Sequence, residues 1–139
     1  MSKKVFIAEA DAITEDLKER ANFWMCRPEI CPTKDIQICR AVIPPGEGHN
    51  FHTHPELEES IYVLEGEIEQ WLLRERQTLK SGELADIPRG VVHATFNCSD
   101  KDALILASAC HPSIYGFQTS SSVRPLQTSS RCLNTTRSF

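Results

Sequence analysis

The chain has 139 residues, of which 40% are hydrophobic and 24% are charged. That length fits one domain of roughly 100–200 residues, and the charged fraction is close to the globular average of about 25%, which argues against wholesale disorder. The formal net charge of −4 argues against a protein that binds nucleic acid through its phosphates. No run approaches the ~18 apolar residues of a membrane-spanning helix, and no apolar segment for secretion follows the start. We therefore expect a soluble, cytoplasmic, single-domain protein that binds neither nucleic acid nor membrane.

The first 35 residues contain one stretch with helical character, residues 11–20. Helix-forming residues predominate there, and Ile13 and Leu17 are four residues apart, with charged residues around them. Pro28 and Pro32 break any helix that continues beyond this stretch. The sequence thus predicts a short N-terminal helical segment in an extension that precedes the main domain.

From residue 35 onward the sequence is typical of short β-strands. Strand candidates bounded by Gly, Pro, Ser and Asp turn residues lie at residues 35–43, 60–73, 82–88, 91–96 and 103–109. Strands that recur every 8–12 residues with turn signals between them favour an all-β sandwich or barrel. We expect an N-terminal extension over residues 1–35, a barrel over 36–117 and a tail over 118–139.

The C-terminal stretch, residues 117–139, differs in composition from the rest of the chain. It is rich in Ser and Thr and carries three arginines and no acidic residue, whereas residues 1–116 have a net charge of −7. Two interpretations remain open: a flexible, solvated terminus, or a basic segment that lies on the acidic barrel or on a partner.

Six cysteines are many for a chain of this length. Without a signal for secretion, the sequence favours reduced thiols, several of them acting as small buried hydrophobic residues. No two are spaced as C-x-x-C, so a zinc site made of thiolates has little support. The cysteines are Cys26, Cys31, Cys39, Cys98, Cys110 and Cys132.

Residues 46–66 hold two histidines and a glutamate whose side chains can meet. His52 and His54 are two residues apart, which puts both imidazoles on the same face of a strand, and Pro55 ends that strand. A turn then allows a second strand, which carries Glu59, to return antiparallel. If Glu59 faces the barrel interior, its carboxylate lies opposite the imidazoles and needs a metal or a cationic partner, because an unpaired buried carboxylate is costly.

Residues 82–97 add a third histidine, His93, in a strand that follows the turn residues Pro88 and Gly90. Three imidazoles and one carboxylate are a good ligand set for a borderline divalent metal such as iron, manganese, nickel, cobalt or zinc. The set leaves one or two positions open on a five- or six-coordinate ion. Open positions are typical of catalytic rather than structural metal sites.

The two stretches resemble the two motifs of the cupin superfamily. The first motif is filled at every fixed position, in the order Gly46, five residues, His52-Thr53-His54, four residues, Glu59, six residues and Gly66. The second is equally complete, in the order Gly82, five residues, Pro88-Arg89-Gly90, two residues, His93, three residues and Asn97. Fifteen residues separate the motifs, a spacing like that of small microbial cupins, and the resemblance covers about residues 36–117.

This resemblance implies a small antiparallel β-barrel of jelly-roll type with a metal inside. The implied ligands are His52, His54, Glu59 and His93, and the implied metal is Fe2+ or Mn2+, with Zn2+, Ni2+ or Co2+ as alternatives. Single-domain cupins often dimerise, so we expect a homodimer. Similar barrels serve as dioxygenases, isomerases, decarboxylases, epimerases, storage proteins and ligand sensors, and the fold therefore does not name the reaction.

Two other histidines receive ordinary structural interpretations. His49 precedes His52 by three residues, which puts it on the opposite face of a regular strand, at the surface or rim, with contact to a substrate as the alternative. His111 follows the last core strand beside Cys110, and adjacent side chains point apart, so we do not expect joint thiol and imidazole chemistry there. Glu56 and Glu58 are expected in a solvated turn.

The remaining candidates are arginines and aromatic residues near the barrel mouth. Arg74 and Arg89 are interpreted as solvent-exposed, with an anionic substrate as the alternative partner, since a guanidinium binds a carboxylate in bidentate fashion. Four aromatic residues are assigned to barrel packing or a dimer contact: Tyr62, Trp71, Phe96 and Tyr115.

Three functions fit these observations. The preferred one is a metal-dependent enzyme that acts on a small organic molecule as a dioxygenase, with Glu59 as a catalytic base. The thiol dioxygenases among cupins lack this glutamate, so Glu59 counts against that subclass. A redox-neutral isomerase or decarboxylase, in which the metal polarises a carbonyl, is the second. The third is a non-catalytic protein that binds a sugar or a small metabolite.

Overall fold

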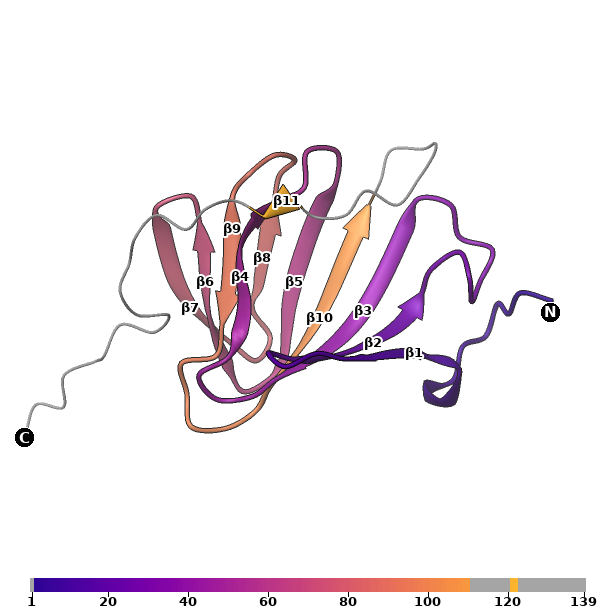
Figure 1. Cartoon of the computed structure of the whole chain (residues 1–139), viewed down its shortest axis with the longest axis horizontal. Coiled ribbons are helices and arrows are strands. Elements are labelled where there is room, and N and C mark those ends of the chain that lie inside the picture. Colours follow the sequence, from indigo (N-terminus) through magenta and orange to yellow (C-terminus); the bar gives the residue numbers. More distant parts are fainter. Residues whose placement is uncertain (1, 111–120, 123–139) are drawn as a thin grey trace, which may run out of the picture.

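The computed structural model describes residues 2–110 and 121–122, which form two antiparallel β-sheets that face each other (Figure 1). The strands are β1 Ile13–Asp16, β2 Ala21–Cys26, β3 Ile36–Ile43, β4 Gly48–Thr53, β5 Glu58–Glu65, β6 Glu67–Leu72, β7 Glu75–Lys80, β8 Leu84–Ile87, β9 His93–Phe96, β10 Ala103–Cys110 and β11 Ser121–Ser122. One sheet has the order β1-β2-β3-β10-β5-β8, and the other has the order β11-β4-β9-β6-β7. The predicted all-β jelly-roll class is confirmed.

The core lies between the two sheets, where the inner faces of their strands meet. Alternation sets this face: Ala41 and Ile43 of β3 are buried, as are Ile61 and Val63 of β5. Ile68 of β6, which is 1% exposed, meets them from the other sheet within the same cluster. Each such aliphatic side chain contributes about 1.5–3 kcal/mol by leaving water, so this cluster holds the two sheets together.

One turn glycine and one asparagine fix connections between strands. Gly66 joins β5 to β6 at a positive φ of 76°, and a Cβ there would lie 2.8 Å from the Asp102 carbonyl oxygen. Asn97, which is fully buried, donates from Nδ2 to the carbonyl oxygens of Ile43 and Lys101 at 2.7 and 2.6 Å. The last residue of the second motif therefore ties the end of β3 to the loop that follows β9.

The N-terminal helix expected over residues 11–20 is wrong in its extent. The structure has only a single 3-10 turn, Glu9–Asp11, followed by the hairpin of β1 and β2. The two apolar residues of the expected helix, Ile13 and Leu17, are both exposed, so that helix had no buried face to stabilise it. Instead β2 pairs with β3 and extends the barrel sheet, which gives the extension its packing partner.

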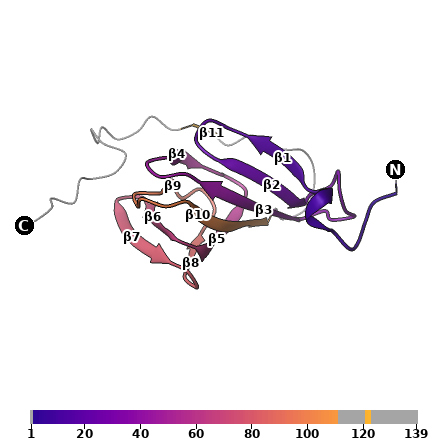
Figure 2. The same cartoon turned by 90° about the horizontal axis from the view of Figure 1, so that it is seen from below.

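β4 and β5 do not form the hairpin that the sequence suggested. β4 pairs with β9 and β11, whereas β5 pairs with β10 and β8 in the other sheet. The two strands still run past each other, but across the barrel interior (Figure 2). Side chains on their inner faces therefore point toward one another from opposite walls.

The predicted tail, residues 118–139, lies outside the described residues apart from Ser121–Ser122, which pair with Thr53 and His52 of β4. The domain boundaries proposed from the sequence stay predictions. Across the described part of the chain, no helix has the length and apolar character needed to cross a membrane.

Four cysteines of the described chain are free thiols, Cys26, Cys31, Cys39 and Cys110. Cys31 and Cys39 are buried, as expected for small hydrophobic residues. Cys98 is in a disulfide, so the prediction of reduced thiols is wrong for that residue.

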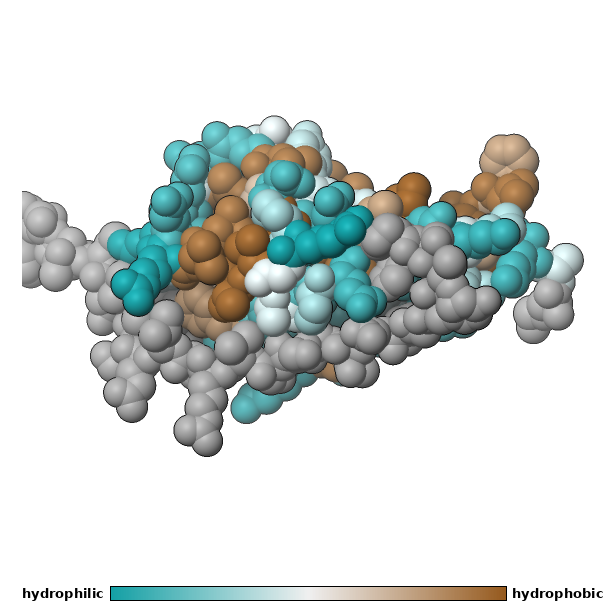
Figure 3. Space-filling model, turned by 90° about the horizontal axis from the view of Figure 1, so that it is seen from above, coloured by the Kyte–Doolittle hydropathy of each residue, from teal (hydrophilic) through white to brown (hydrophobic). Residues whose placement is uncertain are grey.

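The surface presents hydrophobic patches bordered by hydrophilic residues, as Figure 3 shows for the face seen from above. One exposed apolar pair is Tyr62 of β5 and its register partner Leu84 of β8, which are 36% and 53% exposed. The homodimer stays a prediction, and this pair is where we would first look for its contact.

Candidate metal centre

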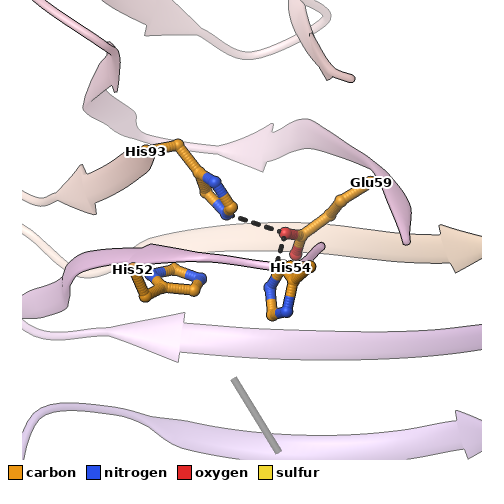
Figure 4. A group of neighbouring side chains, drawn as sticks. All are labelled: His52, His54, Glu59 and His93. Carbon is orange, nitrogen blue, oxygen red and sulfur yellow. Dashed lines mark hydrogen bonds and ion pairs between the residues drawn. The ribbon is translucent and has the colours of Figure 1, made fainter. Parts of the chain in front are cut away.

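The four side chains that the cupin resemblance names meet inside the barrel (Figure 4). His52 lies on β4, His54 follows the end of that strand, His93 lies on β9, and Glu59 comes from β5 in the facing sheet. One ligand atom from each lies within 4.8 Å of the others. The structure therefore brings together the four residues that the sequence named, although the strand of Glu59 was expected to pair with the strand of His52 and instead pairs with β10 and β8.

Two of the histidines are oriented by backbone carbonyl groups. Nδ1 of His52 donates to the Asn50 carbonyl oxygen at 2.7 Å, and Nδ1 of His93 donates to the Val91 carbonyl oxygen at 2.9 Å. These bonds direct Nε2 of each ring at the cluster, and Nε2 of His52 has its lone pair available. Metal-binding histidines are commonly fixed in this way, because the second nitrogen sets the tautomer and the ring angle.

Glu59 interacts with two of the imidazoles. Its Oε2 lies 3.0 Å from Nε2 of His93 and 3.4 Å from Nε2 of His54. Burial raises the pKa of this carboxyl, but the hydrogen bonds from His54 and His93 outweigh burial and hold the pKa well below its usual range. Glu59 is therefore an ionised carboxylate at neutral pH, in contact with two of the three imidazoles of the cluster.

His52 supplies the observation that tests the fit of a metal. Its Nε2 is buried and has no hydrogen-bond partner, which is a costly state for a polar atom. Burial, reinforced by the nearby charge of His93, lowers the pKa of His52 to about 4, so the ring is neutral at pH 7. Donor atoms that each lie about 2.1 Å from one ion are at most about 4.2 Å apart, so the cluster needs to contract by only a few tenths of an ångström. The residues present fit a divalent metal.

His49 does not lie where strand alternation predicts. Its ring stacks on that of His52, with the centroids 3.8 Å apart, so it faces the cluster rather than the surface. The cause is an irregularity in the pairing of β4 with β9 between His49 and His52, which changes the side on which the earlier residue points. Burial, followed by the charges of His52 and Arg20, lowers the pKa of His49 to about 2. The prediction of a surface or rim position is wrong.

Arg20 is a residue near the site that the sequence interpretation did not single out. It lies at the turn of the β1–β2 hairpin, and its charge acts on His49 and Glu59. Burial lowers the pKa of the guanidinium, while nearby carboxylates oppose that change. No motif marked this residue, because it reaches the site only after β2 joins the barrel sheet.

The remaining candidates lie away from the four ligands. Arg74 is exposed in the β6–β7 turn, and the exposed Arg89 lies 3.9 Å from Glu58. Trp71 and Phe96 pack edge-on against Phe51, in agreement with a packing role. Two further sequence candidates, His111 and Tyr115, lie outside the described residues.

A separate hollow of about 230 Å³ lies between β6, β7 and β8. None of the four ligand residues lines it. One lining residue, Gln70, accepts a hydrogen bond from Oγ1 of Thr95 at 2.6 Å, and Thr95 follows His93 by two residues in β9.

The site agrees with what comparison with known proteins shows. The family model described as a cupin domain matches residues 39–108. Germin-like protein subfamily 2 member 2 of Arabidopsis thaliana is 35% identical over 81 residues, which is 55% of this chain and 37% of that protein. The chain thus spans less than half the length of the curated relatives it matches.

Two solved structures share the fold at low sequence identity. KdgF from Halomonas sp. has a TM-score of 0.69 at 17% identity, covering 80% of this chain and 96% of the other. A predicted oxalate decarboxylase from Thermotoga maritima has a TM-score of 0.69 at 19% identity, covering 77% and 99%. These likenesses show the barrel, while the ligand geometry comes from the chain's own residues.

Proposed function

Since this chain belongs to the cupin family, and since its barrel encloses three imidazoles and a carboxylate, we propose that it is a divalent-metal-dependent enzyme acting on a small organic molecule. Dioxygenase chemistry with Fe2+ or Mn2+ is the reaction class that we place first. The proposal concerns the barrel described here, because the activity of the longer relatives cannot be carried over whole.

The buried, unpartnered Nε2 of His52 carries the proposal. A protein gains nothing from leaving such an atom without a partner, but the same lone pair binds a metal directly. When bound, a divalent metal with open positions supplies a Lewis acid, and iron or manganese also supplies a redox centre for dioxygen. Four protein ligands leave room for a small molecule beside them.

The chain's own residues have distinct roles in this proposal. His52 and His93 are held rigidly by their Nδ1 bonds to backbone carbonyl oxygens, which keeps their Nε2 atoms in place during turnover. Glu59 balances positive charge as a carboxylate. It becomes an effective base only when it separates from His54 and His93, because their hydrogen bonds keep its pKa low.

A redox-neutral decarboxylation is the second candidate. It is favoured by the likeness to the Thermotoga maritima protein, whose description is a predicted oxalate decarboxylase. In that case the site polarises a carboxylate or carbonyl group without consuming dioxygen. A barrel that binds a metabolite without converting it is the outcome that remains if neither reaction is found.

Elemental analysis of protein purified without chelator tests the metal first. We expect about one iron or manganese per chain, and an affinity at least about 100-fold weaker in His52→Ala and Glu59→Ala, since each removes a ligand. His49→Ala is the matched control: it removes an imidazole in contact with the cluster but no ligand, so metal content should stay as in the wild type. A normally metallated Glu59→Ala protein would contradict the four-ligand site.

Oxygen uptake with a panel of small organic molecules then separates the reaction classes. Uptake that needs the metal and is lost in Glu59→Ala supports a dioxygenase. Conversion of a carboxylic acid with release of carbon dioxide and no oxygen uptake supports the second candidate. Tight binding of a panel member without conversion would move the chain to the non-catalytic class.

A further inference from the structure

The β1–β2 hairpin adds a polar wall to the barrel interior. In β2, Asn22 and Trp24 are register partners of the buried core residues Ala41 and Cys39, so they share the inner face of the sheet. Asn22 is itself buried at 6% exposure. Glu15 of β1 accepts from Nε1 of Trp24 at 2.8 Å and from Nδ2 of Asn22 at 3.3 Å. The hydrogen bonds to Glu15 thus hold the side chains of Asn22 and Trp24 in place on this face.

Arg20 continues this inner face at the tip of the hairpin. It precedes Asn22 by two residues, and its backbone is paired with Leu17 across the turn, so strand alternation directs its side chain to the same side. Figures 1 and 2 both place the hairpin tip beside β4, the strand that carries His49 and His52. The charge of Arg20 acts on both His49 and Glu59, which agrees with this placement.

The Arg20 side chain is half-buried and has no fixed partner. Other arginines of the described chain make ion pairs, such as Arg27 with Glu29 and Arg40 with Glu9. The Arg20 side chain makes no hydrogen bond or ion pair within residues 2–110 and 121–122. Glu19 is the carboxylate whose charge acts most strongly on Arg20, yet it forms no ion pair with Arg20 there, and Glu15 already accepts from two donors.

His49 is similarly available. Its ring stacks on His52, yet neither of its ring nitrogens makes a hydrogen bond in the described part of the chain. The guanidinium of Arg20 and the imidazole N–H of His49 thus lie on neighbouring elements beside the metal-ligand cluster. Neither donor group has a hydrogen-bond acceptor in the described part of the chain.

We propose that Arg20 and His49 form an anion subsite beside the four metal ligands, and that this subsite binds the carboxylate group of the substrate. The inference rests on the proposed function for the location of the reacting atoms, but the subsite itself is built only from residues of this chain. A guanidinium fits a carboxylate with two parallel hydrogen bonds, and partial burial strengthens the pair by reducing competition from water.

The charged groups around the subsite are carboxylates, to which a bound metal would add positive charge. Glu15, Glu19 and Glu59 lie within electrostatic range of Arg20. Of these, Glu59 belongs to the ligand cluster and Glu15 is held by Trp24 and Asn22, so both are engaged elsewhere. A divalent cation at the cluster adds two positive charges, of which Glu59 cancels one. A small carboxylic acid is therefore the substrate class that this wall selects over an uncharged sugar or alcohol.

Calorimetric titration of Co2+-loaded protein with malonate and with malonamide, its uncharged analogue, tests the subsite at low salt. We expect the wild type to bind malonate at least tenfold more tightly than malonamide. Arg20→Gln should weaken malonate binding at least tenfold. The malonate affinity of Arg20→Lys should lie between those of the wild type and Arg20→Gln, because lysine keeps the positive charge but loses the bidentate hydrogen bonding of the guanidinium. His49→Ala should weaken malonate binding by a smaller factor than Arg20→Gln does.

Two controls separate recognition from structure. Arg74→Gln removes an exposed arginine from the β6–β7 turn and should leave both affinities unchanged. Co2+ affinity and the urea midpoint of Arg20→Gln should match the wild type. Equal malonate affinity in Arg20→Gln and wild type overturns the subsite, as does wild-type protein that does not prefer malonate over malonamide.

The same titration distinguishes failure of the subsite from failure of the proposed function. If the wild type binds no Co2+, the metal enzyme is refuted, and malonate binding by the metal-free protein still reports on Arg20. If Co2+ binds normally but malonate affinity is insensitive to Arg20, the metal site stands and the subsite falls. The visible Co2+ spectrum adds an independent readout, since it changes when a carboxylate reaches the metal. In Arg20→Gln, this spectral change should appear only at a higher malonate concentration than in the wild type.

Discussion

The two walls of the metal centre were specified by the sequence in different ways. The wall made of β4 and β9 carries its ligands at fixed spacings, and the three histidines meet as those spacings imply. The hairpin of β1 and β2, at the edge of the opposite sheet, carries no motif, and its first half was expected to be helical. Yet both walls face the same cluster. The difference teaches that the spacing of ligands is a local property of the sequence. The hairpin wall, in contrast, forms only because β2 pairs with β3 and so joins the barrel sheet.

The largest expected effect in this comparison is on the motif wall, at Gly48 of β4. A Cβ at this position would meet the carbonyl oxygen of Thr95 and lie 2.7 Å from Cδ1 of Phe96, so β4 can approach β9 only because no side chain intervenes. Gly48→Ala should lower the free energy of unfolding by about 3 kcal/mol and should weaken metal binding, because it separates His52 from His93. Urea unfolding and metal titration measure both.

Gly82→Ala is the control for that substitution. Its φ of +89° strains any side chain, but no atom lies within 4 Å of the added Cβ, so the expected cost is only about 1 kcal/mol. A Gly48→Ala protein as stable as Gly82→Ala would show that the close approach of β4 and β9 is not needed.

A middle-sized effect is expected on the hairpin wall, at Trp24. Trp24→Phe removes the hydrogen bond from Nε1 to Glu15 and should cost about 1–2 kcal/mol in urea unfolding. Trp71→Phe removes a hydrogen bond of the same length, 2.8 Å to Glu69, from the other sheet and is the matched control. Both variants should lose similar stability, but only Trp24→Phe should weaken malonate binding, since only the hairpin of β1 and β2 carries Arg20. Equal loss of malonate affinity in the two variants would break the comparison.

The smallest effect is a pH dependence that belongs to the hairpin alone. The hydrogen bond from Trp24 holds the pKa of Glu15 below its ordinary value despite partial burial. A carboxyl whose pKa is lower in the folded state contributes stability above about pH 4.5, and that contribution is lost as the pH falls through the folded-state value. Wild-type protein should therefore lose stability faster than Glu15→Gln between pH 5 and pH 3. Urea midpoints of the two proteins that fall in parallel would contradict this.

Much of the fold and site followed from the sequence where residue type and spacing act locally. Pro88 and Gly90 marked the turn before β9, and the other strands of the barrel were recognised from the turn residues that bound them. The four ligands could be named because each fills a fixed position of the two motifs that resemble those of cupins. His49 could not be placed by the same reasoning, since one irregularity in the ladder between it and His52 reversed its side.

By itself, the sequence determined that this chain forms an all-β cupin barrel and which four residues offer ligand atoms, because alternation and turn chemistry act over a few residues. Only the tertiary structure decided that Glu59 comes from the facing sheet, that His49 turns inward and that Arg20 reaches the site. Each of these depends on which strands become neighbours. That choice is made by burial of side chains that are distant in sequence, such as Ile43 against Ile68, and no local pattern records it.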